Sequence, residues 1–192
     1  MVRLFFDTET TGLPKSFGAP STDVDNWPRL VQLSWILSDE RKELSRADLI
    51  IRPDGFEIPK AASDVHGITT EMAMNSGISV KKAVYYFLGA ARCASVLVGH
   101  NVTFDTSVVG AELVRAYGKD YIYGIPTHDT MRSSIDFCAI PGVRGNKFPK
   151  LIELYRKLFG HDFEDAHNSM ADISATYECY WKLVELGLIE KL

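Results

Sequence analysis

A short apolar run near the start of the chain ends in two closely spaced acidic residues. Residues 2–6 read Val-Arg-Leu-Phe-Phe, and they are followed by Asp7, Thr8 and Glu9 and then by a polar Thr-Thr-Gly turn. Such a run, bounded by turn residues, is typical of a buried strand. Side chains two positions apart on a strand leave the same face, so both carboxylates should enter one pocket. The competing interpretation is a surface strand end that carries two solvated acids.

The rest of the chain alternates between strand and helix patterns. Period-2 alternation predicts a strand over residues 31–37, and short apolar runs predict further strands over 49–52 and 95–99. Helical spacing with caps and closing glycines predicts helices over 79–92, 103–117, 129–138, 149–159 and 168–186. Strands followed by alternating strands and helices indicate an α/β fold with a mixed central sheet flanked by helices.

Length and composition fit one ordinary globular domain spanning 1–192. The chain is 46% hydrophobic and 24% charged, which argues against disorder. No apolar stretch approaches the ~20 residues of a membrane span. The three cysteines, Cys93, Cys138 and Cys179, form no C-x-x-C pair, which argues against a disulfide framework and a structural zinc site. We therefore expect a protein of the reducing cytoplasm, without a membrane anchor.

Charge is distributed unevenly along the chain. The net charge of −4 argues against a nonspecific nucleic-acid coat protein, whose affinity rests on lysine and arginine. Residues 141–160 are nevertheless basic, with Glu153 as the only acid among Arg144, Lys147, Lys150, Arg156 and Lys157. A basic patch beside an acidic site suits a polyanionic substrate. A solvated helix face explains the same residues equally well.

The segment between the first two predicted strands is long and rich in turn residues. Residues 14–28, the 14–28 loop, carry Trp27 near their end. A loop of this length in a compact domain is usually functional or mobile. Trp27 is predicted to stack on the bases of a single strand. The alternative is that Trp27 anchors the loop to the body of the protein.

Two further stretches carry acids at predicted helix starts. Asp105 follows a predicted strand and a Gly-His-Asn turn, which places it at the sheet edge where α/β ligand sites concentrate. His167 and Asp172 would lie about 140° apart on one helix, so His167 should precede the helix and reach the pocket from a loop. A helix macrodipole alone also favours an acid in a first turn. If the acids converge, they suit a pair of hard divalent cations ~3.5–4 Å apart.

Together these stretches resemble the DEDD-type 3'-5' exonuclease superfamily in its histidine-bearing (DEDDh) branch. These RNase H-like exonucleases include polymerase proofreading subunits, RNase T and oligoribonuclease. The resemblance rests on Phe-Asp-Thr-Glu-Thr-Thr-Gly-Leu at 6–13, on Gly-His-Asn-x-x-Phe-Asp at 99–105 and on the His…Asp stretch at 167–172. Residues 64–69 also resemble a family segment, whereas Ser169 replaces the family's usual alanine.

The resemblance implies roles for the acidic residues and the histidine. Asp7, Glu9 and Asp172 would bind a first metal, Asp7 would bridge to a second, and Asp105 would support that second metal directly or through water. His167 would act as general base toward the attacking water. The implied cofactors are two Mg²⁺ ions, with Mn²⁺ expected to substitute.

The resemblance also implies a pocket for the terminal nucleotide. Thr8, Thr10 and Leu13 would line it, with the Thr10 hydroxyl at the 3' end and Leu13 wedged beside the base. His66 would contact the same nucleotide, and Phe104 would pack beneath the site or against a base. These roles follow from the motifs alone.

The implied function is metal-dependent 3'-5' exonucleolytic hydrolysis of single-stranded nucleic acid, releasing nucleoside 5'-monophosphates. DNA is favoured, as in proofreading or repair, and a DNA polymerase subunit or a second copy of the chain would be compatible partners. An RNA 3'-end processing exoribonuclease is the first alternative, and a non-catalytic nucleic-acid-binding adaptor is the second. The complete set of acids and the histidine favours an enzyme over an adaptor, and scarce His and Cys ligands disfavour a zinc hydrolase. Asp129 matches a family position without an implied role.

Overall fold

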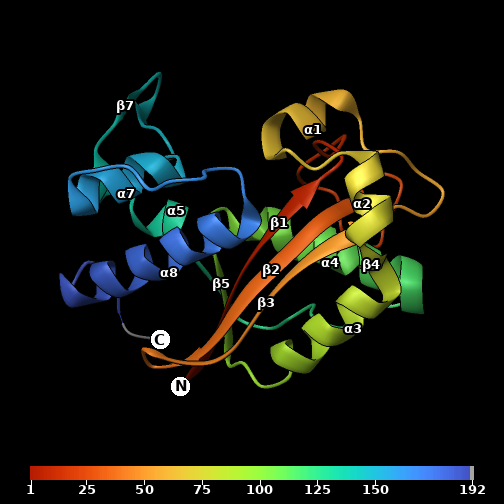
Figure 1. The fold of residues 1–192 in the computed structure, drawn as a ribbon. Helices are drawn as coiled ribbons and strands as arrows, with labels where there is room; N and C mark the ends of the chain where they lie inside the picture. Colours follow the sequence, from red (N-terminus) through yellow and green to blue (C-terminus); the bar gives the residue numbers. More distant parts are fainter. Residues whose placement is uncertain (191–192) are drawn as a thin grey trace.

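A mixed six-stranded sheet forms the centre of the computed structural model, which describes residues 1–190 (Figure 1). The strand order is β4-β3-β2-β1-β5-β6. β1 pairs antiparallel with β2 and parallel with β5, β2 pairs antiparallel with β3, and β3–β4 and β5–β6 are parallel. The strands are β1 (Val2–Thr10), β2 (Leu30–Asp39), β3 (Lys42–Arg52), β4 (Ile78–Ser79), β5 (Val96–Gly99) and β6 (Thr127–Asp129). The mixed sheet with flanking helices confirms the predicted fold class.

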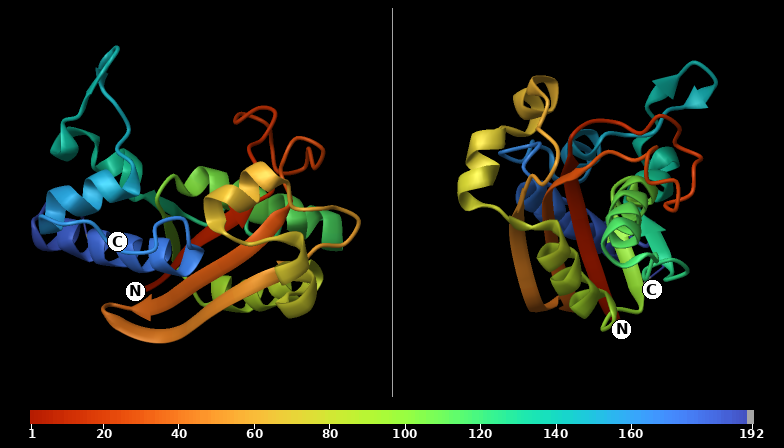
Figure 2. Two further views of the ribbon diagram at one scale, coloured as in Figure 1. Left: turned by 45° about the horizontal axis from the view of Figure 1, so that its top comes forward. Right: turned by 90° about the vertical axis from the view of Figure 1, so that its right-hand side faces the viewer.

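Helices cover both faces of the sheet (Figures 1 and 2). The helices are α1 (Lys60–His66), α2 (Thr70–Ser76), α3 (Val80–Ala91), α4 (Val102–Tyr117), α5 (Thr130–Ser133), α6 (Ile135–Cys138), α7 (Leu151–Phe159) and α8 (Ser169–Glu185). A small hairpin, β7 (Pro141–Gly142) and β8 (Gly145–Asn146), precedes α7. None of the helices in the described part of the chain combines the length and apolarity needed to cross a membrane.

The alternation of side chains along β1 decides which helix each residue meets. Leu4 and Phe6 pack in the core shared with α3 and α4. Phe5 packs on the opposite face, with residues of α8 such as Ile173 and Tyr180. Because side chains alternate, Asp7 and Glu9 continue the α8 face, and Thr8 continues the α4 face.

Several elements differ from the predicted ones. β3 begins at Lys42 instead of residue 49, because residues 42–48 pair with β2 across a tight turn although their side chains are mostly exposed. The predicted helix over 129–138 is two short helices that meet at Ser134. Two short helices, α1 and α2, occur where hydrophobic periodicity predicts none. In each case pairing or packing with distant residues overrides the local pattern.

Candidate metal and nucleic-acid site

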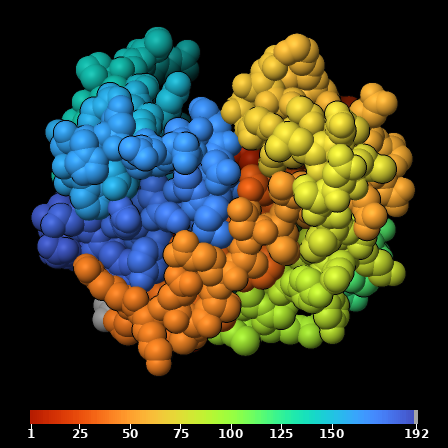
Figure 3. Space-filling model, in the orientation of Figure 1, coloured from red at the N-terminus to blue at the C-terminus, as the bar shows by residue number. Residues whose placement is uncertain are grey.

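Three carboxylates meet where β1 ends beside the start of α8. Asp7 and Glu9 come from β1, and Asp172 comes from the first turn of α8. One oxygen of each lies within 4.8 Å of the other two. Figure 3 shows the end of β1 (red) at the bottom of a hollow between the α8 side (blue) and the α1–α2 side (yellow). The structure thus brings together in one cluster the two acids of the strand end and the acid of the last helix.

Burial and mutual repulsion make this cluster unfavourable when it is fully ionised. Desolvation by the surrounding protein raises the pKa of Asp7 well above its usual range, and the charges of Asp105, Asp172 and Glu9 raise it further. Desolvation and the neighbouring acids raise the pKa of Glu9 to about 8. Desolvation raises the pKa of Asp172 to about 6, against the opposing effect of His167. Hard oxygen donors that repel one another fit a divalent cation such as Mg²⁺, which would relieve the repulsion.

Asp105 approaches the cluster from the other face of β1. Its Oδ1 accepts hydrogen bonds from the Thr8 hydroxyl at 2.7 Å and from the Thr8 backbone N–H at 3.1 Å. Burial raises the pKa of Asp105 to about 7, although the bonds from Thr8 lower it. Asp105 is not part of the three-carboxylate group, but its charge acts on Asp7. The Thr8 hydroxyl is therefore directed at Asp105, and its predicted contact with a nucleotide stays a prediction.

His167 lies ahead of α8, as the helical geometry requires. α8 begins at Ser169, and its N-cap Asn168 accepts from the N–H groups of Met170 and Ala171. His167 adopts a left-handed backbone conformation with φ of 71°, and its N–H donates to Asp172 Oδ2 at 3.2 Å. The side chain is exposed beside the acidic cluster. This placement leaves the imidazole accessible to a substrate and to solvent.

A buried polar network that the motifs did not reveal fixes the start of α8 against β1. The Ser169 hydroxyl donates to the backbone carbonyl of Asp7 at 2.9 Å, and Ser169 is fully buried. The Ser169 N–H donates to Gln32 Oε1 at 3.4 Å, and Gln32 Nε2 donates to Asp48 Oδ1 at 2.6 Å. β2 thereby helps to set where Asp172 meets β1. The only sequence signal for this network is the departure from alanine at position 169.

Of the predicted substrate-binding residues, Leu13 is exposed and His66 is buried. Leu13 is 76% exposed at the end of the Thr-Thr-Gly turn. His66 is buried, its Nδ1 accepts from the Ile68 N–H at 3.1 Å, and its Nε2 makes no hydrogen bond to any described residue. Burial lowers the pKa of His66, with a smaller opposing effect of the Thr10 backbone. The Nε2 atom is itself enclosed by protein, so the predicted contact of His66 with a nucleotide stays a prediction.

Thr10 and Phe104, like Thr8, make their contacts within the protein. The Thr10 hydroxyl donates to the Gly12 carbonyl at 2.7 Å and so shapes the turn that presents Leu13. Phe104 packs partly buried on the main core, with its ring centroid 6.3 Å from that of Trp27. Phe104 therefore lies in the protein body, as the expectation that it packs beneath the site requires.

The prediction that Trp27 stacks on bases is wrong. Trp27 is only 4% exposed and belongs to the main core. Its Nε1–H donates to the Pro20 carbonyl at 3.1 Å, and its own carbonyl accepts from Arg115 at 2.7 Å. The buried ring, the indole N–H and the backbone carbonyl of Trp27 together hold the 14–28 loop against α4. The alternative role, anchoring the loop, is the one that the structure shows.

Asp129 has a structural role. Its Oδ1 accepts from the Asn101 N–H at 2.9 Å and from the Met131 N–H at 3.0 Å, so it caps α5 and holds the turn ahead of α4. His100 in the same turn bonds Thr130 and the Pro149 carbonyl. These bonds fix the turn that orients the first residues of α4.

The basic residues of 141–160 are partly neutralised by acids in this segment and just after it. Lys147 pairs with Glu153 at 2.6 Å, and Arg156 pairs with Asp162 at 2.6 Å. The Lys157 ammonium lies 5.8 Å from the centre of the Phe137 ring. The net positive field of this segment is therefore weaker than its sequence suggests.

The comparisons with known proteins agree with this geometry. Residues 4–180 match a family model described as RNase T: Exonuclease. Over 178 residues the chain is 27% identical to the PolC-type DNA polymerase III of Pediococcus pentosaceus, covering 92% of this chain and 11% of that protein. It superposes on Escherichia coli Exonuclease I bound to a dT13 oligonucleotide with a TM-score of 0.73 and 22% identity, covering 96% of this chain and 41% of that one. For a zinc-bound complex of the same enzyme with single-stranded DNA, the TM-score is 0.72 and the sequence identity is 20%. That match covers 97% of this chain and 40% of the other chain. This chain thus spans less than half the length of these relatives.

Proposed function

This chain belongs to the exonuclease family, and we propose that residues 1–192 form one domain that removes nucleotides from the 3' end of single-stranded DNA in a metal-dependent reaction. The observation that carries the proposal is the cluster of Asp7, Glu9 and Asp172 at the end of β1. The DNA oligonucleotides bound to E. coli Exonuclease I and the DNA polymerase identity of the PolC-type relative favour DNA over RNA.

Two divalent cations are proposed as cofactors, with Mg²⁺ as the expected ion. Asp7, Glu9 and Asp172 would hold one of them, and Asp7 with Asp105 would support the other. Such cations supply positive charge that offsets the negative charge developing on the phosphodiester oxygens. The raised pKa values of Asp7 and Glu9 support this assignment, because binding a cation is one way to stabilise both in their ionised form.

His167 is proposed as the general base that takes a proton from the attacking water. Its exposed side chain stands next to the carboxylate cluster, on a segment whose backbone is tied to Asp172. A base on a loop can approach the reacting water and then return its proton to solvent. Release of nucleoside 5'-monophosphates follows if water attacks the phosphorus on the side opposite the 3' oxygen of the preceding nucleotide.

Leu13 and His66 are proposed to select the end of a strand over its interior. Leu13 is apolar and exposed, so it can pack beside a terminal base. His66 borders the same end of β1, and its buried Nε2 would meet the terminal nucleotide after a rearrangement that exposes the ring. Together they would hold the last phosphodiester bond over the acidic cluster.

The proposal is tested with purified protein and 5'-labelled DNA and RNA oligonucleotides, each with Mg²⁺ and with a chelator. We expect a ladder of products shortened from the 3' end, dependent on the metal and faster on DNA. Asp7→Asn should abolish cleavage, whereas Asp54→Asn, at an exposed site away from the cluster, should not. Cleavage by Asp7→Asn near the parent rate would refute the metal site. Faster cleavage of RNA would move the assignment to an exoribonuclease, and binding without cleavage by the parent would identify an adaptor.

A further inference from the structure

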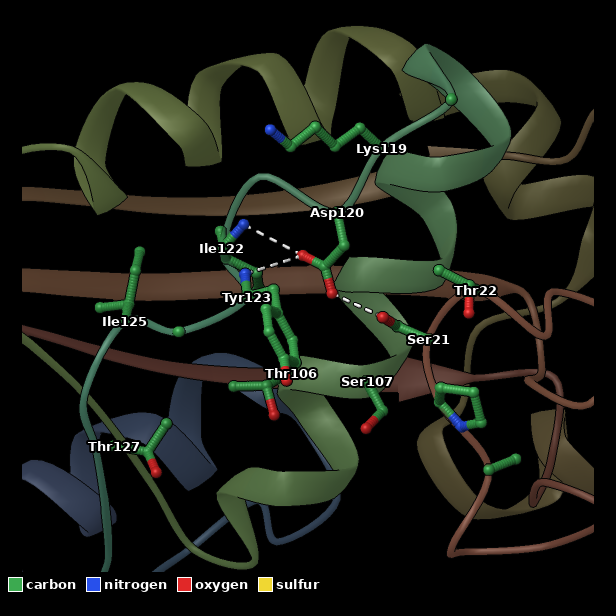
Figure 4. A pocket seen from close by; sticks show the side chains of 14 residues that line it. Ser21, Thr22, Thr106, Ser107, Lys119, Asp120, Ile122, Tyr123, Ile125 and Thr127 are labelled. Carbon is green, nitrogen blue, oxygen red and sulfur yellow. Dashed lines mark hydrogen bonds between the residues drawn. The ribbon is translucent and has the colours of Figure 1, made fainter.

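A cavity of about 600 Å³ lies on the outer side of α4, apart from the carboxylate cluster (Figure 4). Its walls come from three segments: residues 19–22 of the 14–28 loop, Thr106 and Ser107 of α4, and residues 118–127. A volume in this range is typical of sites for small molecules or for single units of a polymer. We propose that this cavity binds one nucleotide of the single-stranded substrate outside the catalytic pocket, an inference that rests on the proposed function.

Hydrogen bonds fix the positions of the two loop segments that form the cavity walls. The Asp120 carboxylate accepts from the Ser21 hydroxyl at 2.6 Å and from the N–H groups of Ile122 and Tyr123 at 3.0 Å each. These bonds tie the 14–28 loop to the 118–127 segment, as the dashed lines in Figure 4 show. Gly110 of α4 allows the close approach, because a Cβ there would overlap the Asp120 and Ser21 side chains.

The same bonds and Lys119 make the cavity acceptable to an anion. Three donors bond the Asp120 carboxylate, which keeps its negative charge, and the neighbouring Lys119 offsets that charge. Lys119 is exposed in the cavity wall, and no ion pair joins it to any described acidic residue. Its ammonium is held 5.6 Å from the centre of the Tyr121 ring. Figure 4 shows the Lys119 side chain on the other side of Asp120 from Thr106 and Ser107, so Lys119 can contact a backbone phosphate at the rim of the cavity.

The remaining lining suits a base without selecting one. Tyr123 is 87% exposed and presents a ring on which any base can stack. Ile122 and Ile125 add apolar surface, and hydroxyl groups come from Ser21, Thr22, Thr106, Ser107 and Thr127. Hydroxyls both donate and accept, so they can bond any base edge or a phosphate. An exonuclease that proceeds along a strand needs contacts of this sequence-tolerant kind.

The chain path connects the cavity to the proposed catalytic pocket. The 14–28 loop starts directly after Leu13, and Figure 2 shows that it lies beside α4. Thr106 and Ser107 follow Asp105 on α4, so all three lie within ~3 Å along the helix axis, on different faces of the helix. A single strand whose 3' end lies at Leu13 can therefore pass around this end of α4 and place an upstream nucleotide in the cavity.

The test compares Tyr123→Ala and Lys119→Gln with the matched surface variant Tyr85→Ala on α3, where Tyr85 is 64% exposed. The substrates are DNA oligonucleotides of 2–20 nucleotides and the nitrophenyl ester of thymidine 5'-monophosphate, which reaches only the catalytic pocket. For the parent and Tyr85→Ala, KM should drop once the oligonucleotide is long enough to reach the cavity. For Tyr123→Ala that drop should vanish, which corresponds to a roughly 5- to 150-fold higher KM on long substrates. Its kcat and its activity on the ester should match the parent.

A binding measurement completes the test and separates it from the proposed function. The Asp7→Asn protein, with and without Tyr123→Ala, is titrated with fluorescent dT12 and with short dT oligonucleotides. The cavity is supported if adding Tyr123→Ala to the Asp7→Asn protein weakens the binding of dT12 and leaves the binding of the short oligonucleotides unchanged. The cavity proposal would be overturned if the two proteins bound dT12 with equal affinity, or if Tyr123→Ala and the parent had the same KM at every oligonucleotide length. If the parent does not hydrolyse the ester, the proposed function is contradicted. The titration would still show whether the cavity binds a nucleotide.

Discussion

The Ser169 hydroxyl donates a hydrogen bond of 2.9 Å to the backbone carbonyl of Asp7, across 162 positions of sequence. The bond joins the first residue of α8 to the strand that carries two of the three clustered carboxylates. Because Asp172 lies on the same helix, the position of this contact determines how closely Asp172 approaches Asp7 and Glu9. Ser169 is therefore a positioning residue for the cluster.

Replacing Ser169 by alanine should weaken both the fold and the metal site. The loss of one buried hydrogen bond should cost about 1 kcal/mol of the free energy of unfolding, which lowers Tm by ~2–4 °C in a chain of this size. Calorimetric titration with Mn²⁺ should show up to about 10-fold weaker binding. Ser174→Ala, which removes a local bond to the Met170 carbonyl on the same helix, should leave the affinity for Mn²⁺ unchanged. Unchanged Mn²⁺ affinity in Ser169→Ala would show that the bond is structural only.

The metal-free protein should lose stability as pH rises from about 4 to about 8. Folding raises the pKa of Glu9 to about 8, of Asp105 to about 7 and of Asp172 to about 6. The folded state then binds more protons than the unfolded state in this window, so the free energy of unfolding falls with increasing pH. Thermal unfolding in a chelator should show this slope, and saturating Mg²⁺ should reduce it.

A comparison with Asp7→Asn checks the origin of that slope. The substitution removes the Asp7 carboxyl, whose ionisation is opposed by desolvation and by the charges of Asp105, Asp172 and Glu9. The variant should therefore be as stable as the parent or more stable at pH 8 without metal, with a shallower pH dependence. A parent Tm that rises steadily between pH 5 and pH 8 in chelator would contradict the assigned electrostatics.

Replacing His167 by alanine should remove one limb of the pH–rate profile. If His167 is the base, activity of the parent increases with pH across the titration range of a histidine, because only neutral imidazole accepts a proton. The variant should lose that limb together with ~10²–10⁴-fold of the rate. His161→Ala, an exposed histidine in the same segment, serves as the control. A variant with the parent's profile would exclude His167 as the base.

Replacing Trp27 by alanine should lower stability without changing chemistry in the catalytic pocket. The side chain is 4% exposed in the main core, and truncation of such a residue typically costs about 3–5 kcal/mol. Tm should fall strongly, while hydrolysis of the nitrophenyl ester of thymidine 5'-monophosphate, measured well below the new Tm, stays unchanged. Phe17→Ala, at a 60% exposed position of the same loop, should leave Tm unchanged. A raised KM at unchanged Tm would restore the stacking interpretation.

The sequence by itself determined the features that depend on local pattern. Alternation along β1 correctly put Asp7 and Glu9 on one face, and the 100° step of a helix correctly put His167 ahead of α8. Gly118 and Gly160 end α4 and α7 in a left-handed C-cap, a conformation that glycine adopts at least cost because it has no Cβ. These predictions rest on steric rules that act over a few residues, and here the tertiary structure does not override them.

Only the tertiary structure decided which of these residues meet. The Thr8–Asp105 bonds join residues 97 positions apart, and the Ser169–Asp7 bond joins residues 162 positions apart. Trp27 is anchored by Arg115, 88 positions away, so nothing in the turn-rich 14–28 loop indicated that its ring would be buried. Burial depends on which distant surface covers a side chain, and desolvation and repulsion raise a carboxyl pKa only after folding brings the charges together.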